Sequence, residues 1–312
     1  MQHKEAILAS YQRISPYIHK TLVFTSEGIN AICGAELFFK CENFQKMGAF
    51  KMRGATNAIL QLTEAQRSKG VVTHSSGNFA QALSLAAKSL GVPAYIVMPE
   101  NAPQVKKDAV ISYHGQITIC EATIEAREST FAKIAKETGA AFVHPSNDID
   151  VIHGNATACL ELLEEHPHLE MVIAPVGGGG LLAGTALATH YFGKNCIAIG
   201  GEPTAVNDAY RSLKSGKIET NSSTNTIADG LRTNLGNINF PILQKHVDQI
   251  ICVEEQDILE AMQLIYQRLK IVVEPSSAVA LAVVLKNKKS FENKSVGIVL
   301  SGGNVDLQKL PF

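Results

Sequence analysis

The amino-acid sequence predicts an α/β protein that is built from two parallel-sheet domains. Short apolar runs rich in β-branched residues alternate with longer segments of helical period, which is the order expected for parallel strands covered by helices. Between residues 71 and 144 the strands recur at a regular strand–helix spacing, which indicates a small domain. We expect residues 1–60 together with 149–312 to form a large domain, and residues 61–148 to form a small, mobile one. A single continuous sheet is the alternative.

The predicted strands are short apolar runs bounded by turn residues, and the predicted helices are the longer periodic segments between them. Strands are expected at residues 36–40, 71–74, 94–98, 116–120, 141–144, 171–175, 197–201, 249–253 and 296–300. Helices are expected at residues 51–62, 79–90, 103–113, 121–137, 149–165, 181–191, 254–269 and 276–285.

The composition and charge narrow the class of protein. The 312 residues carry 28 basic and 29 acidic side chains, a net charge of -1, so neither a nucleic acid nor a membrane is an expected partner. No apolar run approaches the roughly 18 residues of a spanning helix, and the first residues lack the order of a secretory signal. The six cysteines are scattered, as expected for thiols in a reducing compartment, which predicts a cytoplasmic location.

A turn of small polar residues follows the predicted strand 71–74. It reads Ser75, Ser76, Gly77, Asn78, and a helix is expected to start at Phe79. Small residues let backbone N–H groups converge on an anion, and the dipole of the helix adds to the attraction. The turn is therefore a candidate site for a carboxylate or phosphate, and an ordinary turn with a serine N-cap is the alternative.

Four consecutive glycines, Gly177, Gly178, Gly179 and Gly180, follow the predicted strand 171–175. Such a run carries a heavy cost in backbone entropy, whereas a structural turn needs only one or two glycines. The run indicates close approach of the backbone to a phosphate, although it lacks the Walker pattern. A flexible turn is the alternative interpretation.

The last predicted strand, 296–300, ends in Ser301 beside Gly302 and Gly303. A hydroxyl at this position can hydrogen-bond a ring nitrogen of a flat ligand. An ordinary turn would show the same residues.

Lys51 is expected at the first turn of a helix. Its positive charge there opposes the helix dipole, which lowers the pKa of the amine and favours a lysine that acts as a nucleophile. A surface lysine is the alternative for this residue taken alone.

These blocks, taken together and in order, resemble the fold-type II (β-family) pyridoxal-phosphate enzymes, with a fold like the β subunit of tryptophan synthase. Among them the chain is most similar to serine/threonine dehydratases and serine racemases. The resemblance runs from about Ile14 to Asp306 and is carried by residues 38–45, 50–54, 73–78, 177–180 and 300–304. It implies that pyridoxal 5′-phosphate lies in the cleft between the domains, that the substrate is a small amino acid and that the protein is a homodimer.

The resemblance also implies a role for each candidate residue. Lys51 would carry the cofactor and then accept the α-proton of the substrate as a general base. The other cofactor contacts would come from Phe50 beside the ring, Asn78 near the 3′-oxygen, Gly177, Gly178, Gly179 and Gly180 at the phosphate, and Ser301 at the ring nitrogen. The substrate carboxylate would bind Ser75, Ser76, Gly77 and Asn78.

The activity implied first is a serine/threonine ammonia-lyase, which converts L-serine or L-threonine to a 2-oxo acid and ammonia. Serine racemisation is an alternative, with Ser76 as the acid/base on the second face of the cofactor or only as a donor to the carboxylate. Dehydration of 3-hydroxyaspartate is another, for which Arg127 could meet the extra carboxylate, although a helix-surface arginine is the default interpretation. A protein that only binds a cofactor or an amino acid would not need Lys51.

Residues 201–208 resemble the divalent-metal loop of the racemase-like subgroup. Glu202 and Asp208 would supply carboxylate oxygens and Val206 its carbonyl, a donor set that suits Mg²⁺ or Ca²⁺. The ion would have a structural role. A solvated loop with Asp208 as an N-cap is the alternative.

Three features set limits on the resemblance. Phe79 stands where the family pattern continues with histidine, so a polar contact at the mouth of the site would be lost. Ser146 replaces a polar group that lines the cofactor pocket in relatives. The sequence ends at Phe312, shortly after the last matching block, so a regulatory domain that senses a branched-chain amino acid is not expected.

Overall fold

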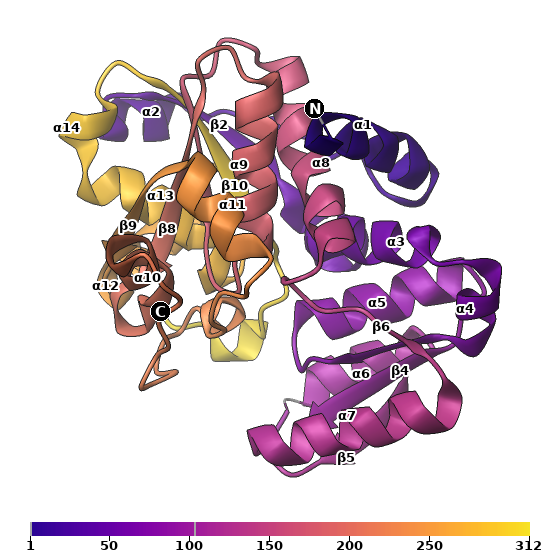
Figure 1. Ribbon diagram of the computed structural model, residues 1–312. Coiled ribbons are helices and arrows are strands. Elements are labelled where there is room, and N and C mark those ends of the chain that lie inside the picture. The colour runs from indigo at the N-terminus through magenta and orange to yellow at the C-terminus, as the bar shows by residue number, and fades with distance from the viewer. Residues whose placement is uncertain (1, 103) are drawn as a thin grey trace.

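The computed structural model describes residues 2–102 and 104–312. Within these ranges the strands form a six-stranded sheet in the order β1-β2-β10-β7-β8-β9 and a four-stranded sheet in the order β5-β4-β3-β6, as the two lobes of Figure 1 show. Only the pairing of β1 with β2 is antiparallel among the described strands. The predicted α/β fold with two parallel sheets is confirmed, and the single continuous sheet is wrong.

Every predicted strand is present, with ends that differ by at most a few residues. The six-stranded sheet contains β1 Val23–Phe24, β2 Glu36–Cys41, β7 Met171–Pro175, β8 Ile197–Pro203, β9 Val247–Val253 and β10 Ser295–Leu300. The four-stranded sheet contains β3 Val71–His74, β4 Ala94–Pro99, β5 Gln116–Cys120 and β6 Ala141–Phe142. The sequence did not predict β1, because two residues are too few to show an alternating pattern.

The predicted helices are also present, although Pro103, the expected first residue of one of them, lies outside the described residues. They are α3 Lys51–Gln61, α5 Asn78–Ser89, α6 Gln104–Ser112, α7 Ile124–Thr138, α8 Ile149–Glu165, α9 Gly180–Phe192, α12 Glu255–Arg268 and α13 Pro275–Lys286. Helix α7 begins later than predicted because the Thr123 hydroxyl accepts a hydrogen bond from the Ala126 N–H and caps the helix there.

Further helices were not predicted. They are α1 Gln2–Ile14, α2 Glu27–Cys33, α4 Glu64–Lys69, α10 Asp208–Ser215, α11 Asn239–His246 and α14 Lys288–Phe291. Helix α1 buries Ile7, Ser10 and Ile14, which lie on one face at helical spacing, so periodicity could have found it. The others are mostly too short for a period of 3.6 residues to stand out.

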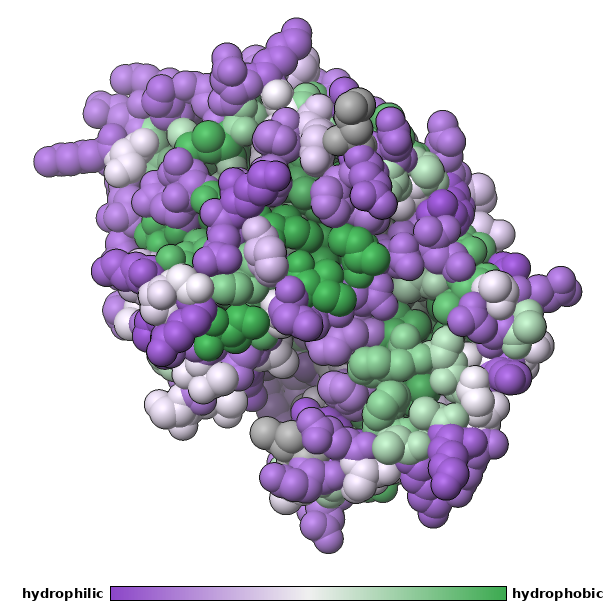
Figure 2. All heavy atoms as spheres, viewed as in Figure 1, coloured by the Kyte–Doolittle hydropathy of each residue, from purple (hydrophilic) through white to green (hydrophobic). Residues whose placement is uncertain are grey.

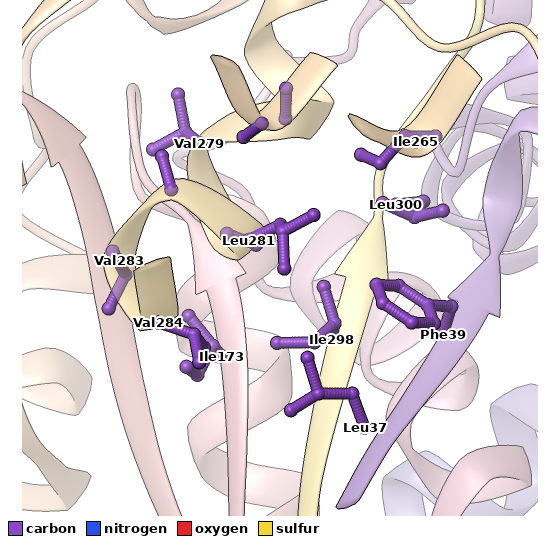
Figure 3. Close-up of a cluster of buried hydrophobic side chains, with 14 of the residues drawn as sticks. Leu37, Phe39, Ile173, Ile265, Val279, Leu281, Val283, Val284, Ile298 and Leu300 are labelled. Carbon is purple, nitrogen blue, oxygen red and sulfur yellow. The ribbon is translucent and has the colours of Figure 1, made fainter. Parts of the chain in front are cut away.

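The large hydrophobic core lies between the six-stranded sheet and α12 and α13. Figure 3 shows Phe39, Ile173 and Ile298 pointing from the strands toward Leu281 and its neighbours on α13. A second cluster covers the other face of this sheet under α8 and α9. The strands of the six-stranded sheet are therefore covered on both sides, which fixes where their carboxyl ends lie.

A third core joins the four-stranded sheet to α3 and α5. Helix α3 contacts α8 as well as α5, so the helix that begins with Lys51 links the two lobes. The boundaries at 60/61 and 148/149, and the mobility of the small domain, stay predictions. In the described part of the chain no helix has the length and apolarity that crossing a bilayer requires.

Candidate active site

Lys51 begins α3, and its side chain reaches the loop between β6 and α8. The Nζ atom donates a hydrogen bond to the Pro145 carbonyl at 2.8 Å and lies 4.9 Å from the ring centre of Phe50 and 5.7 Å from that of Phe79. Burial lowers the pKa of the Lys51 amine to about 8, although Glu274 acts to raise it. The low pKa that the sequence predicts is present, but its main cause is burial.

The four-glycine run packs too closely for side chains. A Cβ on Gly177 would lie 2.6 Å from Leu231 Cα, and one on Gly180 would lie 2.9 Å from Ser146 Cα. Gly179 has φ 83°, which disfavours other residues, and helix α9 starts directly after it. The loop therefore brings the backbone to the positive end of α9, which fits an anion such as the cofactor phosphate.

Ser301 lies directly beside the lysine. The Phe50 N–H donates to the Ser301 carbonyl at 3.0 Å, and the Ser301 and Ser277 hydroxyl oxygens are 3.0 Å apart. Ser277 comes from α13 and also contacts the Gly302 carbonyl at 2.6 Å. Ser277 was not predicted, because nothing in the sequence links it to a residue 24 positions later.

The turn at residues 75–78 reaches the same region from the other sheet. Asn78 starts α5, and its Nδ2 donates to both carboxylate oxygens of Glu274 at 2.8 and 3.0 Å. Asn304 Nδ2 donates to Asn78 Oδ1 at 3.0 Å. No side chain caps α5, so the serine N-cap alternative is wrong.

Three loops at strand ends thus converge near Lys51, as the sequence predicts. Figure 2 shows the surface hollowed between the two lobes. A cavity of about 900 Å³ is lined by Gln81 and Lys106 from one lobe and by Asp229, Arg232 and Asn304 from the other; Lys51, the four glycines and Ser301 do not line it. The Lys51 amine, the four-glycine loop and the Ser301 hydroxyl fit the pyridoxal phosphate that the resemblance implies. The roles of the individual residues stay predictions.

Glu274 is the main residue that the sequence analysis missed. It is 4% exposed, and burial followed by Asp229 raises the pKa of its carboxyl to about 7. His144 was assigned no role from the sequence, and burial, His74 and Lys51 lower the pKa of its imidazole to about 4. A single acidic residue before Pro275 gives no sequence signal that its partner lies in a distant turn.

Arg127 is half-exposed on α7, and its charge acts on His74 at the end of β3. Its charge lowers the pKa of His74, whose ring centre is 6.0 Å from that of His144. The Arg127 Nε atom is buried and has no hydrogen-bond partner in the described chain. Arg127 as a whole is half-exposed, so the helix-surface interpretation and the carboxylate-binding alternative both stay predictions.

Phe79 and Ser146 occupy the positions that depart from the family pattern. Phe79 is 2% exposed and fills space beside the Lys51 amine, so this wall of the site is apolar. Ser146 is buried against the glycine run, where Asn239 Nδ2 donates to the Ser146 carbonyl at 3.2 Å and to the Gly178 carbonyl at 2.8 Å. Asn239 thus fixes the loop from the outside, which the sequence did not indicate.

Glu202 and Asp208 lie together away from Lys51, and both are buried. Glu202 accepts hydrogen bonds from the Ala209 and Tyr210 N–H groups at 2.9 and 2.8 Å, while Asp208 accepts from Asn221 Nδ2 at 2.5 Å. Burial raises the pKa of Glu202 to about 8 and that of Asp208 to about 6. The solvated-loop alternative is wrong. No cluster of three or more acidic, histidine or cysteine ligands occurs in residues 2–102 and 104–312.

Comparison with known proteins agrees with this site. Residues 14–302 match the model of the family described as pyridoxal-phosphate dependent enzyme. The chain is 49% identical over 308 residues to a β-hydroxyaspartate dehydratase of Paracoccus denitrificans, covering 99% of this chain and 98% of that protein. It is 50% identical to a serine racemase of Arabidopsis thaliana, covering 98% and 94% respectively.

Solved structures give the same result. The crystal structure of serine racemase from Dictyostelium discoideum superposes with a TM-score of 0.94 at 48% identity and covers 97% of this chain and 99% of that one. The chain belongs to the pyridoxal-phosphate dependent enzyme family. It is an enzyme of fold type II whose relatives include ammonia-lyases and racemases of small amino acids.

Proposed function

We propose that this enzyme eliminates water from 3-hydroxyaspartate, and that hydrolysis of the resulting enamine takes up one water and releases ammonia and oxaloacetate. The observation that carries the proposal is Arg127, a half-exposed cation that acts on His74 and whose Nε is buried without a partner among the described residues. The similarity to a β-hydroxyaspartate dehydratase supports it, and the relatives favour this activity or racemisation over the serine/threonine ammonia-lyase that the sequence suggested first.

The free-energy cost of a buried donor without a partner supports a ligand-binding role for Arg127. A buried donor without a partner costs about 1–3 kcal/mol, and more for a charged group, so a site that leaves one is suited to a ligand that completes it. The second carboxylate of 3-hydroxyaspartate supplies a charge-assisted partner that serine and threonine lack. Burial and the charge of Arg127 keep the pKa of His74 low, so a neutral His74 does not compete for that carboxylate.

The remaining residues serve the reaction itself. Bound pyridoxal phosphate would supply an electron sink that makes the α-proton of an attached amino acid removable. Lys51, with a pKa of about 8, is suited to accept that proton near neutral pH, and residues 75–78 would hold the α-carboxylate. Phe50 and Phe79 keep water away from the amine. Ser301 offers a neutral hydroxyl, which does not hold a ring nitrogen protonated as a carboxylate would.

Serine racemisation is the second candidate. Ser76 follows β3 in the turn that reaches the site, and its hydroxyl could return a proton to the face opposite Lys51. The similarity to serine racemases over nearly the full chain supports this candidate.

The test compares substrates and variants directly. The holoenzyme is incubated with 3-hydroxyaspartate, L-serine, D-serine and L-threonine, and both oxo acid and enantiomers are quantified. Replacing Arg127 with Ala should lower kcat/KM for 3-hydroxyaspartate by roughly tenfold to a hundredfold, because one charged hydrogen bond is lost, and leave serine turnover nearly unchanged. Lys133→Ala, an exposed cation on the same helix, is the matched control. Equal loss on serine, or no oxaloacetate from wild type, would contradict the proposal.

We also propose that Glu202, Asp208 and the Val206 carbonyl bind Mg²⁺ or Ca²⁺. Two buried carboxylates with raised pKa values lie side by side, and a cation would stabilise their anionic forms. Glu202 also accepts hydrogen bonds from the Ala209 and Tyr210 N–H groups of α10. The ion would therefore have a structural role at α10 and would take no part in the chemistry at Lys51.

We also propose that the protein is a homodimer and that it is located in the cytoplasm. Leu22, Phe44 and Val272 are exposed by 58%, 44% and 43%, and Asn43 Nδ2 donates to the Val272 carbonyl, so the last two lie close together. Apolar side chains gathered on one face support a contact between subunits. Sedimentation analysis should give twice the chain mass, and Phe44→Glu should yield monomer.

A further inference from the structure

Glu274 lies just before α13 and touches the turn that the substrate would meet. Its two carboxylate oxygens both accept hydrogen bonds from Asn78 Nδ2, at 2.8 and 3.0 Å. Asn78 follows β3 of the four-stranded sheet, whereas Glu274 packs with the end of β10 in the six-stranded sheet, because its N–H donates to the Gly302 carbonyl at 3.1 Å. The contact therefore joins the two lobes across the site.

Asn304 also holds the Asn78 side chain in place. Its Nδ2 donates to Asn78 Oδ1 at 3.0 Å and to the Met47 carbonyl at 2.9 Å. Both ends of the Asn78 amide are therefore held by residues of the other lobe. An amide with its donor and acceptor both engaged has one favoured orientation.

The space around the Glu274 carboxylate is closely fitted. A Cβ on Gly302 would lie 2.9 Å from Glu274 Oε1, and the Gly230 N–H next to it is held by the Ser276 hydroxyl at 3.0 Å. Glu274 is thus enclosed by the loop after Ser301 and by the segment that carries Asp229. A carboxylate in such a place has little freedom to turn away from Asn78.

We propose that Glu274 is a positioning residue: it holds the Asn78 amide, which fixes the turn at residues 75–78 relative to Lys51, and it places a negative charge beside the Lys51 amine. The inference rests on the family's chemistry at Lys51 and not on the substrate proposed above. It applies to any amino acid that the enzyme turns over.

The charges around Glu274 give this role an electrostatic readout. Lys51 on α3, Asp229 and Lys106 on α6 are the charged groups that act on it or respond to it. Lys106 and Asp229 form an ion pair with each other, also between the lobes. Because Glu274 raises the pKa of Lys51, removing its charge must lower the pH at which the amine becomes reactive.

Two substitutions separate the effect of the length of the Glu274 side chain from the effect of its charge. Glu274→Gln keeps the length and one acceptor for Asn78 but removes the charge. Glu274→Asp keeps the charge but is one methylene shorter, so it cannot reach Asn78 in the same way. Glu255→Gln is the control: this carboxylate accepts the Ile227 N–H at 2.8 Å, and the same chemical change there touches neither Asn78 nor Lys51.

Three measurements are made on each full-length variant. They are kcat and KM for the best substrate, the pH midpoint for capture of pyridoxal phosphate by the cofactor-free chain, and hydrogen exchange at residues 75–78. We expect Glu274→Asp to raise KM by roughly tenfold to a hundredfold and to speed exchange, and Glu274→Gln to shift the capture midpoint to lower pH. The control should match wild type in all three.

The outcomes are decisive even if one variant is unstable. Unchanged KM, midpoint and exchange in folded Glu274→Gln and Glu274→Asp would overturn the inference. If neither variant folds, Asn304→Ala tests the same fastening from the other end of the Asn78 amide. A raised KM with faster exchange at residues 75–78 would support the role, and wild-type values would overturn it. Failure to act on 3-hydroxyaspartate would refute the proposed substrate while leaving these tests in place.

Discussion

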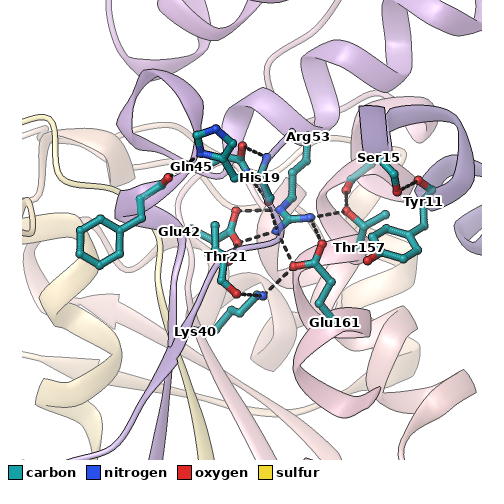
Figure 4. Close-up of polar contacts among 12 residues, drawn as sticks. Tyr11, Ser15, His19, Thr21, Lys40, Glu42, Gln45, Arg53, Thr157 and Glu161 are labelled. Carbon is teal, nitrogen blue, oxygen red and sulfur yellow. Dashed lines mark hydrogen bonds and ion pairs between the residues drawn. The ribbon is translucent and has the colours of Figure 1, made fainter. Parts of the chain in front are cut away.

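Two groups of titratable side chains meet at α3, and their pKa values are shifted in opposite ways. The first, which we call the paired cluster, consists of Lys40, Glu42, Arg53 and Glu161, all with fully buried side chains (Figure 4). Arg53 Nε lies 2.7 Å from Glu42, and Lys40 Nζ lies 2.6 Å from Glu161. The second comprises Lys51, Glu274 and His144 in the candidate active site.

The pKa values show the difference. Burial acts to raise the pKa of Glu42, but Arg53 outweighs it and holds the pKa below its usual value. In the site, burial prevails, lowering the pKa of Lys51 to about 8 and raising that of Glu274 to about 7. Among the described residues no ion pair includes Lys51 or Glu274. The paired cluster is the more deeply buried of the two, yet its charges are fixed by their ionic partners, so the partner decides whether a charge is fixed or able to titrate.

The two groups are coupled through α3. Arg53 follows Lys51 by two positions, so its side chain leaves the helix on a different side and contacts Glu42, directly after β2, and Glu161 on α8. The paired cluster thus anchors the first turn of the helix that presents the lysine. A fully satisfied ionic cluster provides a rigid base for the Lys51 amine, on which the charge of Glu274 acts without forming an ion pair.

Loss of the Lys51 amine should have the largest effect. Lys51→Ala is expected to lower the rate of elimination by about a thousandfold or more, because the proton acceptor and the cofactor attachment are both lost. The absorbance of bound pyridoxal phosphate should shift or disappear. The exposed Lys69→Ala serves as the control, and comparable loss there would show that the effect is not specific to the site.

Breaking the paired cluster should mainly lower stability. Arg53→Met leaves Glu42 and Glu161 buried with one cation between them, and the expected cost is about 3–5 kcal/mol in the free energy of unfolding, measured with urea. Arg67→Met on α4 is the matched control, with an expected change within about 0.5 kcal/mol. A loss below 1 kcal/mol in Arg53→Met would contradict the anchoring role.

The pH dependence of stability should distinguish the two groups. The pKa of Glu274 is raised from 4.5 to about 7, so the folded chain retains a proton that the unfolded chain has released, and stability falls as pH rises from 4.5 to 7. Glu274→Gln should remove a contribution on the order of 3 kcal/mol from this fall. Glu42 has the opposite sign: its contribution is present above pH 4.5 and is lost as the pH falls through its lowered pKa. Parallel pH profiles for wild type and Glu274→Gln would refute the assignment.

Divalent cations should have the smallest effect. Burial raises the pKa of both Glu202 and Asp208, and a bound Mg²⁺ or Ca²⁺ would stabilise their anionic forms. At a hundredfold excess over the dissociation constant, stability should rise by about 2.7 kcal/mol. Calorimetric melting with and without chelator measures this rise, and Asp208→Asn should abolish it. An equal rise in that variant would place the ion elsewhere.

Local pattern explains what could be predicted from the sequence. Apolar runs and glycine turns mark the strands and the three loops, because both depend on neighbours in the chain. The contact of Asn78 with Glu274 joins residues 196 positions apart, and the partners of Arg53 lie 11 and 108 positions away, so no local pattern reveals them. The helix that carries Arg127 is largely polar, so its sequence gives no sign that the charge of Arg127 acts on His74.

The most direct test locates the cofactor on the chain. The holoenzyme is treated with borohydride to make the cofactor attachment permanent, digested, and examined by mass spectrometry. The account predicts a single modified lysine, Lys51, and no modification at the remaining lysines. A cofactor attached to a different lysine, or none attached in an enzyme that is active, would contradict it.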